Sequence, residues 1–322
     1  MWKKVDIVFK LKSPLHIGYM PKGSVVSPTR YYVPGRNLWG AITKRVTEYL
    51  CEKYQRKPES NDYKEIGRQV MENFRFSYFY LYDGRTIYFP RYTERGLMYG
   101  DDRKQLTKSE FERIFIGSLI STAIDSNGTA KDRSLHEIEF INNRFRDENG
   151  DLKDVKIAGC IWIKENAKIV DKEIDINDKG IFIENFNVIR ELTLGGESKY
   201  GFGHVLLDSI NRVESSNLAP FKWEDPEKIE IKSNEPLVAH FKYSKNINFK
   251  GDIELLTGRG YFDPKNHRKA SYKPCEVILK PGEVILKPEY YLSPGTILYS
   301  PPSVKICYDG RMILCSNNDC MP

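Results

Sequence analysis

The sequence predicts an α+β protein in two parts, and three observations carry this prediction. Apolar residues alternate with others over 4–11, which is typical of a half-buried strand. After Arg36, apolar residues recur at helical spacing and share one face. Near residue 213 the composition changes, and no long helical pattern follows. We therefore expect a larger α+β domain over residues 1–212 and a smaller, β-rich domain over 213–322.

The first domain is predicted to open with a strand over 4–11, a loop rich in proline and glycine, and a helix beginning near Arg36. A second helix is expected over 61–74, capped by Ser60. Strands are expected over 76–81 and 85–92 around the turn 82–84, followed by a mobile polar loop over 93–106. A short helix is expected over 107–116.

An exposed hairpin or arm is expected over 121–133, because Asn127-Gly128 is a strong turn signal in its middle. Strands should follow over 135–141 and 155–164. Asp178 can cap a helix whose apolar residues share a face, and a strand over 205–208 should end the domain. The apolar residues of that expected helix are Phe182, Phe186, Ile189 and Leu192. This order is that of a βαββαβ, ferredoxin-like unit with insertions.

The second domain begins after the polar, proline-bearing linker 220–228. Its expected strands cover 235–243, 252–256, 275–279, 284–286 and 304–308. The hexapeptide Glu-Val-Ile-Leu-Lys-Pro occurs at 276–281 and again at 283–288, which we interpret as a local duplication. The domain could be a degenerate second ferredoxin-like unit.

Composition and charge place the chain among ordinary globular proteins and suggest a polyanionic partner. Of 322 residues, 40% are hydrophobic and 29% charged. No apolar run approaches the ~18 residues that a membrane span needs, so we expect a cytoplasmic protein. The net charge is +6, but residues 1–50 alone carry nine Lys or Arg against two acids. A concentrated positive field favours nucleic acid.

The loop 193–204, Thr-Leu-Gly-Gly-Glu-Ser-Lys-Tyr-Gly-Phe-Gly-His, is the strongest functional signal. Glycines permit positive φ angles, so several backbone N–H groups can turn toward one anion. Lys199 adds a mobile cation, and Tyr200 and Phe202 offer faces on which bases can stack. The surroundings of Lys199 match neither a nucleotide-binding P-loop nor a dinucleotide fingerprint. A plain glycine turn is the competing interpretation.

Several segments, in this order, resemble the RAMP superfamily, the RNA-binding subunits of CRISPR effector complexes. They are Ser13-Pro-Leu-His-Ile-Gly18, the segment 33–42 that opens the first helix, Phe76-Ser-Tyr-Phe-Tyr80 and the glycine loop. Residues 123–130 and 134–139 resemble an arm found in type III members. The position of the glycine loop resembles the branch that binds the 5′ handle of the guide RNA.

The resemblance implies a non-catalytic subunit of a type III effector ribonucleoprotein in antiviral defence. Its partners would be the guide RNA, other RAMP subunits and the large polymerase-like subunit, with no cofactor and no metal. The implied RNA contacts lie in the first loop and helix, the arm and the glycine loop. They are Lys22, Arg30, Arg36, Lys44, Arg45, Lys131, Arg133, Gly195, Gly196, Ser198, Lys199, Tyr200, Gly201, Gly203 and His204.

Target-slicing relatives carry an aspartate in the first loop, but residues 17–34 contain no acid, so target cleavage is not expected.

Two other functions remain open from the sequence, a guide-processing endoribonuclease and a backbone subunit. Guide-processing relatives are metal-independent endoribonucleases that use histidine, which makes His16 an alternative catalytic residue. Alternatively, the chain is a backbone subunit that multimerises along the guide through its arm. The six cysteines show no tight metal-binding spacing, and we expect free thiols.

Overall fold

The computed structural model describes residues 1–18, 25–132, 134–211, 221–256 and 289–315. Its centre is a sheet of strand order β18-β19-β1-β13-β5-β3, in which β4 also pairs with β13. β1 pairs antiparallel with both β13 and β19. The strands are β1 (Trp2–Leu11), β3 (Tyr32–Val33), β4 (Phe74–Phe76), β5 (Phe79–Tyr82), β13 (Lys156–Lys164), β18 (Glu191–Thr193) and β19 (His204–Ile210).

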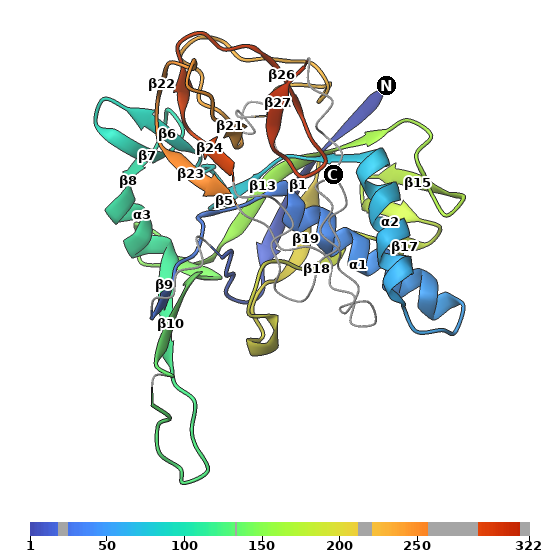
Figure 1. Cartoon of the computed structure of the whole chain (residues 1–322), viewed down its shortest axis with the longest axis horizontal. Coiled ribbons are helices and arrows are strands. Elements are labelled where there is room, and N and C mark those ends of the chain that lie inside the picture. The colour runs from blue at the N-terminus through green and yellow to red at the C-terminus, as the bar shows by residue number, and fades with distance from the viewer. Residues whose placement is uncertain (19–24, 133, 212–220, 257–288, 316–322) are drawn as a thin grey trace.

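The two long helices lie on one face of this sheet (Figure 1). α1 (Gly35–Lys53) places Leu38, Ile42 and Val46 in a buried cluster with alternate residues of β1, because helical spacing gathers them on one side. α2 (Ser60–Asn73) packs beside α1 and begins with a capping box between Glu59 and Asp62. Both helices confirm their sequence predictions to within a few residues.

Residues 221–256 and 289–315 cover the opposite face of the same sheet (Figure 1). A second buried cluster joins Val8, Tyr80 and Trp162 of the central strands to residues such as Phe241 and Met312. The two predicted domains therefore share a hydrophobic core, and the central sheet is buried on both faces. The strands of this region are β20 (Ile229–Glu230), β21 (Phe241–Lys242), β22 (Phe249–Lys250), β23 (Ile253–Leu256), β24 (Glu289–Leu292), β25 (Ile297–Leu298), β26 (Ser303–Ile306) and β27 (Met312–Leu314).

In the β-rich region, six short strands form a sheet of order β20-β26-β27-β21-β24-β23, and β22 pairs with β25. The expected strand over 235–243 is reduced to β21, whereas 252–256 and 304–308 match β23 and β26 closely. The expected strands over 275–279 and 284–286 lie outside the described residues, as does the expected boundary at 212–213.

A long hairpin projects from the body below α3 (Lys108–Phe115) in Figure 1. Its strands β9 (Ile116–Ser121) and β10 (His136–Ile141) pair antiparallel, and β2 (Val26–Ser27) adds to β10 in parallel. Asp125 accepts backbone hydrogen bonds from Asn127 and Thr129 at the far end, as expected for a turn. The predicted arm is thus confirmed as a hairpin.

The expected helix after Asp178 is wrong. Residues 165–190 contain four short strands that pair as a sheet, and residues 191–203 contain β18 and a single 3₁₀ turn η1 (Ser198–Tyr200); neither stretch contains an α-helix. Isoleucines alternate in this stretch, which favours strands, and Glu184 takes a left-handed φ of 54° in the turn between two of them. The strands are β14 (Lys168–Ile169), β15 (Lys172–Asn177), β16 (Gly180–Ile183) and β17 (Phe186–Asn187).

Residues 85–106 also differ from expectation. The predicted strand over 85–92 is shortened to β6, and the predicted mobile loop forms β7 and β8, which pair with it as a three-stranded sheet. These strands are β6 (Pro90–Thr93), β7 (Gly96–Gly100) and β8 (Gln105–Thr107), while a separate hairpin joins β11 (Arg144–Arg146) to β12 (Leu152–Asp154). The many polar residues of this segment give little apolar alternation in the sequence, although Met98, Tyr99 and Leu106 are buried in the structure.

Candidate RNA-binding site

The glycine loop connects β18 to β19 and rests on the chain segment that follows β1. The amide of Gly196 donates to the carbonyl of His16 at 2.9 Å, and that of Gly203 donates to the carbonyl of Pro14 at 2.7 Å. The Ser13 hydroxyl accepts from the amide of His204 at 3.0 Å. Two motifs separated by about 180 residues in the sequence, Ser13–Gly18 and the glycine loop, therefore form one surface.

Glycine is required at particular points of this loop. Gly195 has a φ of +76°, and a Cβ placed on it would lie 2.2 Å from the His16 carbonyl oxygen. Gly203 has a φ of +84°, and its Cβ would lie 2.0 Å from the Leu194 carbonyl oxygen. Gly201 also has a positive φ of +82°, but nothing lies within 4 Å of its Cβ position. A side chain at Gly195 or Gly203 would thus collide with a neighbouring carbonyl oxygen, whereas at Gly201 only the left-handed backbone conformation favours glycine.

The outer part of the loop presents donors and an aromatic ring to solvent. Tyr200 is 62% exposed, and Ser198 and Lys199 are also exposed. Glu197 takes a left-handed φ of 56° immediately before the 3₁₀ turn. Within the described part of the chain, the amides of 197–199 have no hydrogen-bond acceptor. Successive free amides beside a lysine are suited to an anion such as a phosphate.

Phe202 does not offer a face for stacking, contrary to the sequence interpretation. Its side chain is buried, and its ring meets Phe140 edge-on with centroids 5.2 Å apart. It anchors the loop to the sheet that carries the arm. At the other end of the loop, Nε2 of His204 lies 2.6 Å from a carboxylate oxygen of Glu191 on the neighbouring strand.

His16 is buried beneath the glycine loop. Its Nδ1 lies 2.7 Å from the carbonyl oxygen of Glu139, so this nitrogen carries the proton, since a carbonyl only accepts. The described residues around it, Gly18, Gly196 and Glu139, include no second histidine. This position fits a structural support of the loop more closely than a general acid or base with access to RNA.

Arg30 is largely buried and Arg36 is half-buried, although the sequence predicts both as RNA contacts. Arg30 pairs with Glu254 of β23 at 2.9 Å, and both side chains are about nine-tenths buried. Burial alone would lower the pKa of Arg30, but Tyr32 and Glu254 outweigh it and hold this pKa above its ordinary value. The half-buried Arg36 has a pKa lowered first by burial and then by Arg30.

The beginning of α1, which the resemblance offers as a phosphate site, is covered by the chain itself. A Cβ on Gly35 would lie 2.9 Å from both the Asp309 carbonyl oxygen and the Gly310 backbone. The turn between β26 and β27 therefore packs directly on this helix end. Its backbone leaves no room for a phosphate at Gly35.

The other expected contacts are scattered. Lys44 is exposed and lies 3.8 Å from Glu48 on the same helix, while the Arg45 guanidinium lies 5.0 Å from the centre of the Phe186 ring. Lys131 is exposed near the end of the arm. Lys22 and Arg133 lie outside the described residues. The structure therefore gathers the glycine-loop residues in one place but not the helix and arm residues.

Lys12 is a candidate contact that the sequence reasoning missed. Its side chain is exposed, and its amide donates to the carbonyl of His204 at 2.9 Å, which places it beside the glycine loop. Lys12 directly precedes the Ser13–Gly18 motif, and this position in the sequence could have identified it as a candidate contact. Lys12 therefore lies beside the His204 end of the loop, whereas Lys199 lies in its 3₁₀ turn.

A buried polar cluster joins the first loop to the β-rich region. Nδ1 of His240 accepts from the Tyr78 hydroxyl at 2.6 Å, and Nε2 contacts Glu254. Burial lowers the pKa of His240 and outweighs the opposite effect of Glu254. Burial would raise the pKa of Glu254, but His240 and Arg30 together lower it to about 2. The neutral imidazole and the ionised carboxylate are both satisfied in this arrangement.

The buried His240 predicts that the folded protein loses stability in acid. An unfolded histidine binds a proton below about pH 6.5, whereas folded His240 resists protonation, so the unfolded state binds more protons as the pH falls. The free energy of unfolding should therefore fall below pH 6.5, by up to about 1.4 kcal/mol per pH unit from this one site. Urea denaturation at pH 7.5, 6.5 and 5.5 measures this slope. Identical slopes in wild type and His240→Gln would contradict the assignment.

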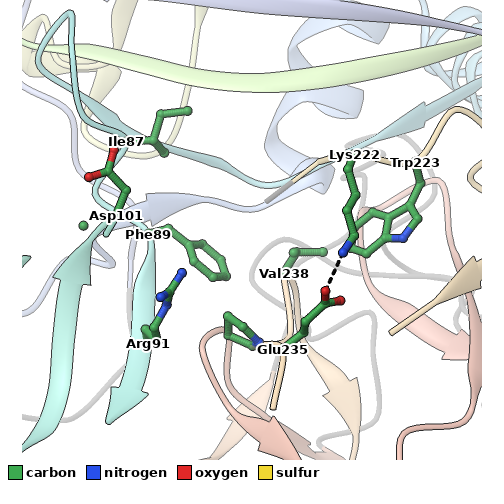
Figure 2. Close-up of a pocket in the computed structure, with 10 residues that line it drawn as sticks. Ile87, Phe89, Arg91, Asp101, Lys222, Trp223, Glu235 and Val238 are labelled. Carbon is green, nitrogen blue, oxygen red and sulfur yellow. Dashed lines mark hydrogen bonds and ion pairs between the residues drawn. The ribbon is translucent and has the colours of Figure 1, made fainter. Parts of the chain in front are cut away.

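A separate cavity of about 160 Å³ lies at the seam between the β6–β7 hairpin and the β-rich region (Figure 2). Its apolar wall includes Ile87, Phe89 and Val238, and an ion pair between Lys222 and Glu235 at 2.5 Å lies on its rim. It shares no lining residue with the segments 12–18 and 194–204. It is therefore separate from the candidate RNA-binding site.

Other site types receive no support from the described residues. No group of three or more histidines, cysteines and acids in the described ranges is arranged to hold a metal ion. Cys51, Cys160 and Cys315 are free thiols, but Cys307 is disulfide-bonded, which departs from the expectation for that cysteine. Among residues that the structure describes, no helix has the length and apolar character needed to span a membrane.

No family model and no curated protein matches this chain. Among solved structures, a chain of the type III-B Cmr-beta complex bound to cognate target RNA and AMPPnP is 13% identical, with a TM-score of 0.49 over 92% of this chain and 86% of that one. A chain of the same complex bound to cognate target RNA is 14% identical, with a TM-score of 0.46 and the same coverage. Oligomeric Cmr4 from Pyrococcus furiosus is 13% identical, with a TM-score of 0.27 over 65% of this chain and 98% of that one.

These structural neighbours are thus chains of the type III-B Cmr-beta complex and of Cmr4. The mixed α+β architecture of this chain is shown by its own strands and helices.

Proposed function

We propose that the chain is a non-catalytic, guide-RNA-binding subunit of a type III CRISPR effector complex. The observation that carries the proposal is the docking of the glycine loop on the Ser13–Gly18 segment. This contact leaves Lys199, Tyr200 and free amides on the surface. A polyanion with unstacked bases is the ligand that these groups suit, because amides and lysine bind phosphates and tyrosine stacks on bases.

In this proposal residues 1–212 hold the RNA near its 5′ handle. The central strand order β19-β1-β13-β5 supports a ferredoxin-like unit in which a small sheet replaces the second helix. Residues 213–322 form the supporting β-rich part. The projecting hairpin, which exposes Ile120 and Ile124, would contact the guide or a neighbouring subunit, and the large polymerase-like subunit is a further partner. Such a complex would assemble in the cytoplasm.

The alternative of a guide-processing endoribonuclease rests on His16. Its ring is buried, and Nδ1 is engaged by the Glu139 carbonyl, so a productive acid or base would need the loop above it to move. The backbone-subunit alternative rests on the arm and is decided by the number of copies per complex. We favour the handle-binding role over both.

Substitutions at the tip of the loop test the proposed contacts. Tyr200→Ala should weaken binding of a labelled guide RNA by about 1–3 kcal/mol if one base stacks on the ring. Lys199→Ala should lower the slope of log affinity against log salt by about one. Fluorescence anisotropy between 50 and 300 mM salt measures both.

The matched control is Lys168→Ala, which removes an exposed lysine that lies 3.6 Å from Glu173 on the neighbouring strand and is not among the proposed RNA contacts. It should leave the affinity and slope close to wild type. Unchanged RNA binding in both loop variants would contradict the proposal.

A further inference from the structure

The glycine loop takes its position from the segment beneath it. Gly196 donates to the His16 carbonyl at 2.9 Å, and the backbone of Gly195 approaches the same carbonyl more closely than any residue with a Cβ could. A displacement of residues 16–18 would therefore move the loop, because packed backbones transmit such shifts.

Arg30 holds that segment in place through its backbone and its side chain. The Arg30 amide donates to the Ile17 carbonyl at 2.7 Å, and its guanidinium donates to the Gly18 carbonyl at 2.6 Å. The same guanidinium reaches Glu254 with its other terminal nitrogen at 2.9 Å. Arg30 is thus a bridge between the segment beneath the loop and the β-rich region.

Glu254 completes this bridge from a distant part of the sequence. It lies on β23, more than 220 residues from Arg30, and one of its oxygens contacts both Arg30 and His240. Removal of one partner of a buried pair leaves an uncompensated buried charge, which is strongly unfavourable. Loss of the carboxylate therefore releases the guanidinium that holds Gly18.

We propose that Glu254 is a positioning residue for the RNA-binding surface. Through Arg30 it fixes residues 16–18 and hence the glycine loop. The β-rich region would then set the geometry of the RNA site without touching RNA. The RNA aspect rests on the function proposed above, whereas the mechanical link between Glu254 and the loop does not depend on it.

Hydrogen exchange separates positioning from general destabilisation. The amide of Gly196 reports the loop directly, since its acceptor is the His16 carbonyl. We compare Glu254→Gln with Val304→Ala, which removes a fully buried side chain from β26 in the same sheet and touches no member of the bridge. Conditions are adjusted with urea so that both variants have the same global stability.

Glu254→Gln should accelerate exchange over 16–18 and 194–203 at least tenfold relative to Val304→Ala. Equal exchange in the two variants overturns the proposal. Glu254→Asp, which keeps the charge on a shorter side chain, should give an intermediate rate and provides the test if the glutamine variant does not fold. Guide-RNA affinity is measured in parallel on the same proteins.

The two failures are distinguishable. If the loop loosens in Glu254→Gln but the wild-type chain binds no RNA, the link between Glu254 and the loop stands and the proposed function falls. If wild type binds RNA and neither the exchange nor the affinity of Glu254→Gln differs from the control, the positioning role falls and the proposed function stands.

Discussion

Trp162→Ala should lower the free energy of unfolding by about 3–5 kcal/mol, which is typical for the loss of a large buried aromatic side chain. Trp162 lies on β13, is fully buried, and donates from its indole nitrogen to the Trp223 carbonyl at 3.1 Å. The truncation would leave a cavity between the central sheet and the β-rich region, and neighbouring side chains can fill it only in part.

Because the two parts share this core, their unfolding should remain coupled. Circular dichroism and hydrogen exchange over the β-rich strands should therefore report the same loss. Tyr299→Ala, which truncates a half-exposed ring in the β-rich region, serves as the control and should change stability by about 0.5 kcal/mol or less. A Trp162→Ala variant whose β-rich strands keep their wild-type stability would contradict the shared core.

Gly195→Ala should damage the glycine loop far more than Gly201→Ala. Both positions have left-handed backbones, so each alanine pays about 1–2 kcal/mol for its conformation. Only at Gly195 does the added carbon meet another backbone, at 2.2 Å from the His16 carbonyl oxygen. The loop must then lift from the Ser13–Gly18 segment.

We expect Gly195→Ala to weaken guide-RNA binding at least tenfold beyond the effect of Gly201→Ala. Anisotropy titrations of both variants, with thermal melts of the same samples, provide the comparison. Equal losses would mean that docking of the loop on residues 13–18 does not matter for binding, and the site would then have to be sought elsewhere on the chain.

The sequence predicted the helices and strands whose buried faces can be recognised from a few consecutive residues. β1, α1, α2, α3 and β13 follow from apolar periodicity and capping, because their buried faces are written in a few consecutive residues. The stretch after Asp178 contains both periodicities, since isoleucines at 174, 176, 181 and 183 alternate while larger residues fall near helical spacing. Pairing between β15, β16 and β17 stabilises the strand conformation of this stretch.

The unusual composition of the glycine loop made it a candidate site in the sequence, but its docking on Ser13–Gly18 was not predicted, because the two segments lie about 180 residues apart. The roles of Arg30 and Arg36 could not be predicted. Both arginines lie in a basic first loop and helix start, and the residues that cover this region are distant in the sequence: Glu254 pairs with Arg30, and the backbone at 309–310 packs on Gly35 beside Arg36. The sequence of residues 30–36 does not predict that Glu254 lies next to Arg30 in the folded chain.

The most direct test of the account is a binding experiment on the wild-type protein. One labelled guide RNA, with and without its 5′ handle, is incubated with the protein in EDTA and run on native and denaturing gels. We expect intact RNA and tighter binding of the form that carries the handle. A discrete cleavage product in EDTA would contradict it and place His16 at the centre of the mechanism, and equal or absent binding of the two RNAs would contradict handle recognition.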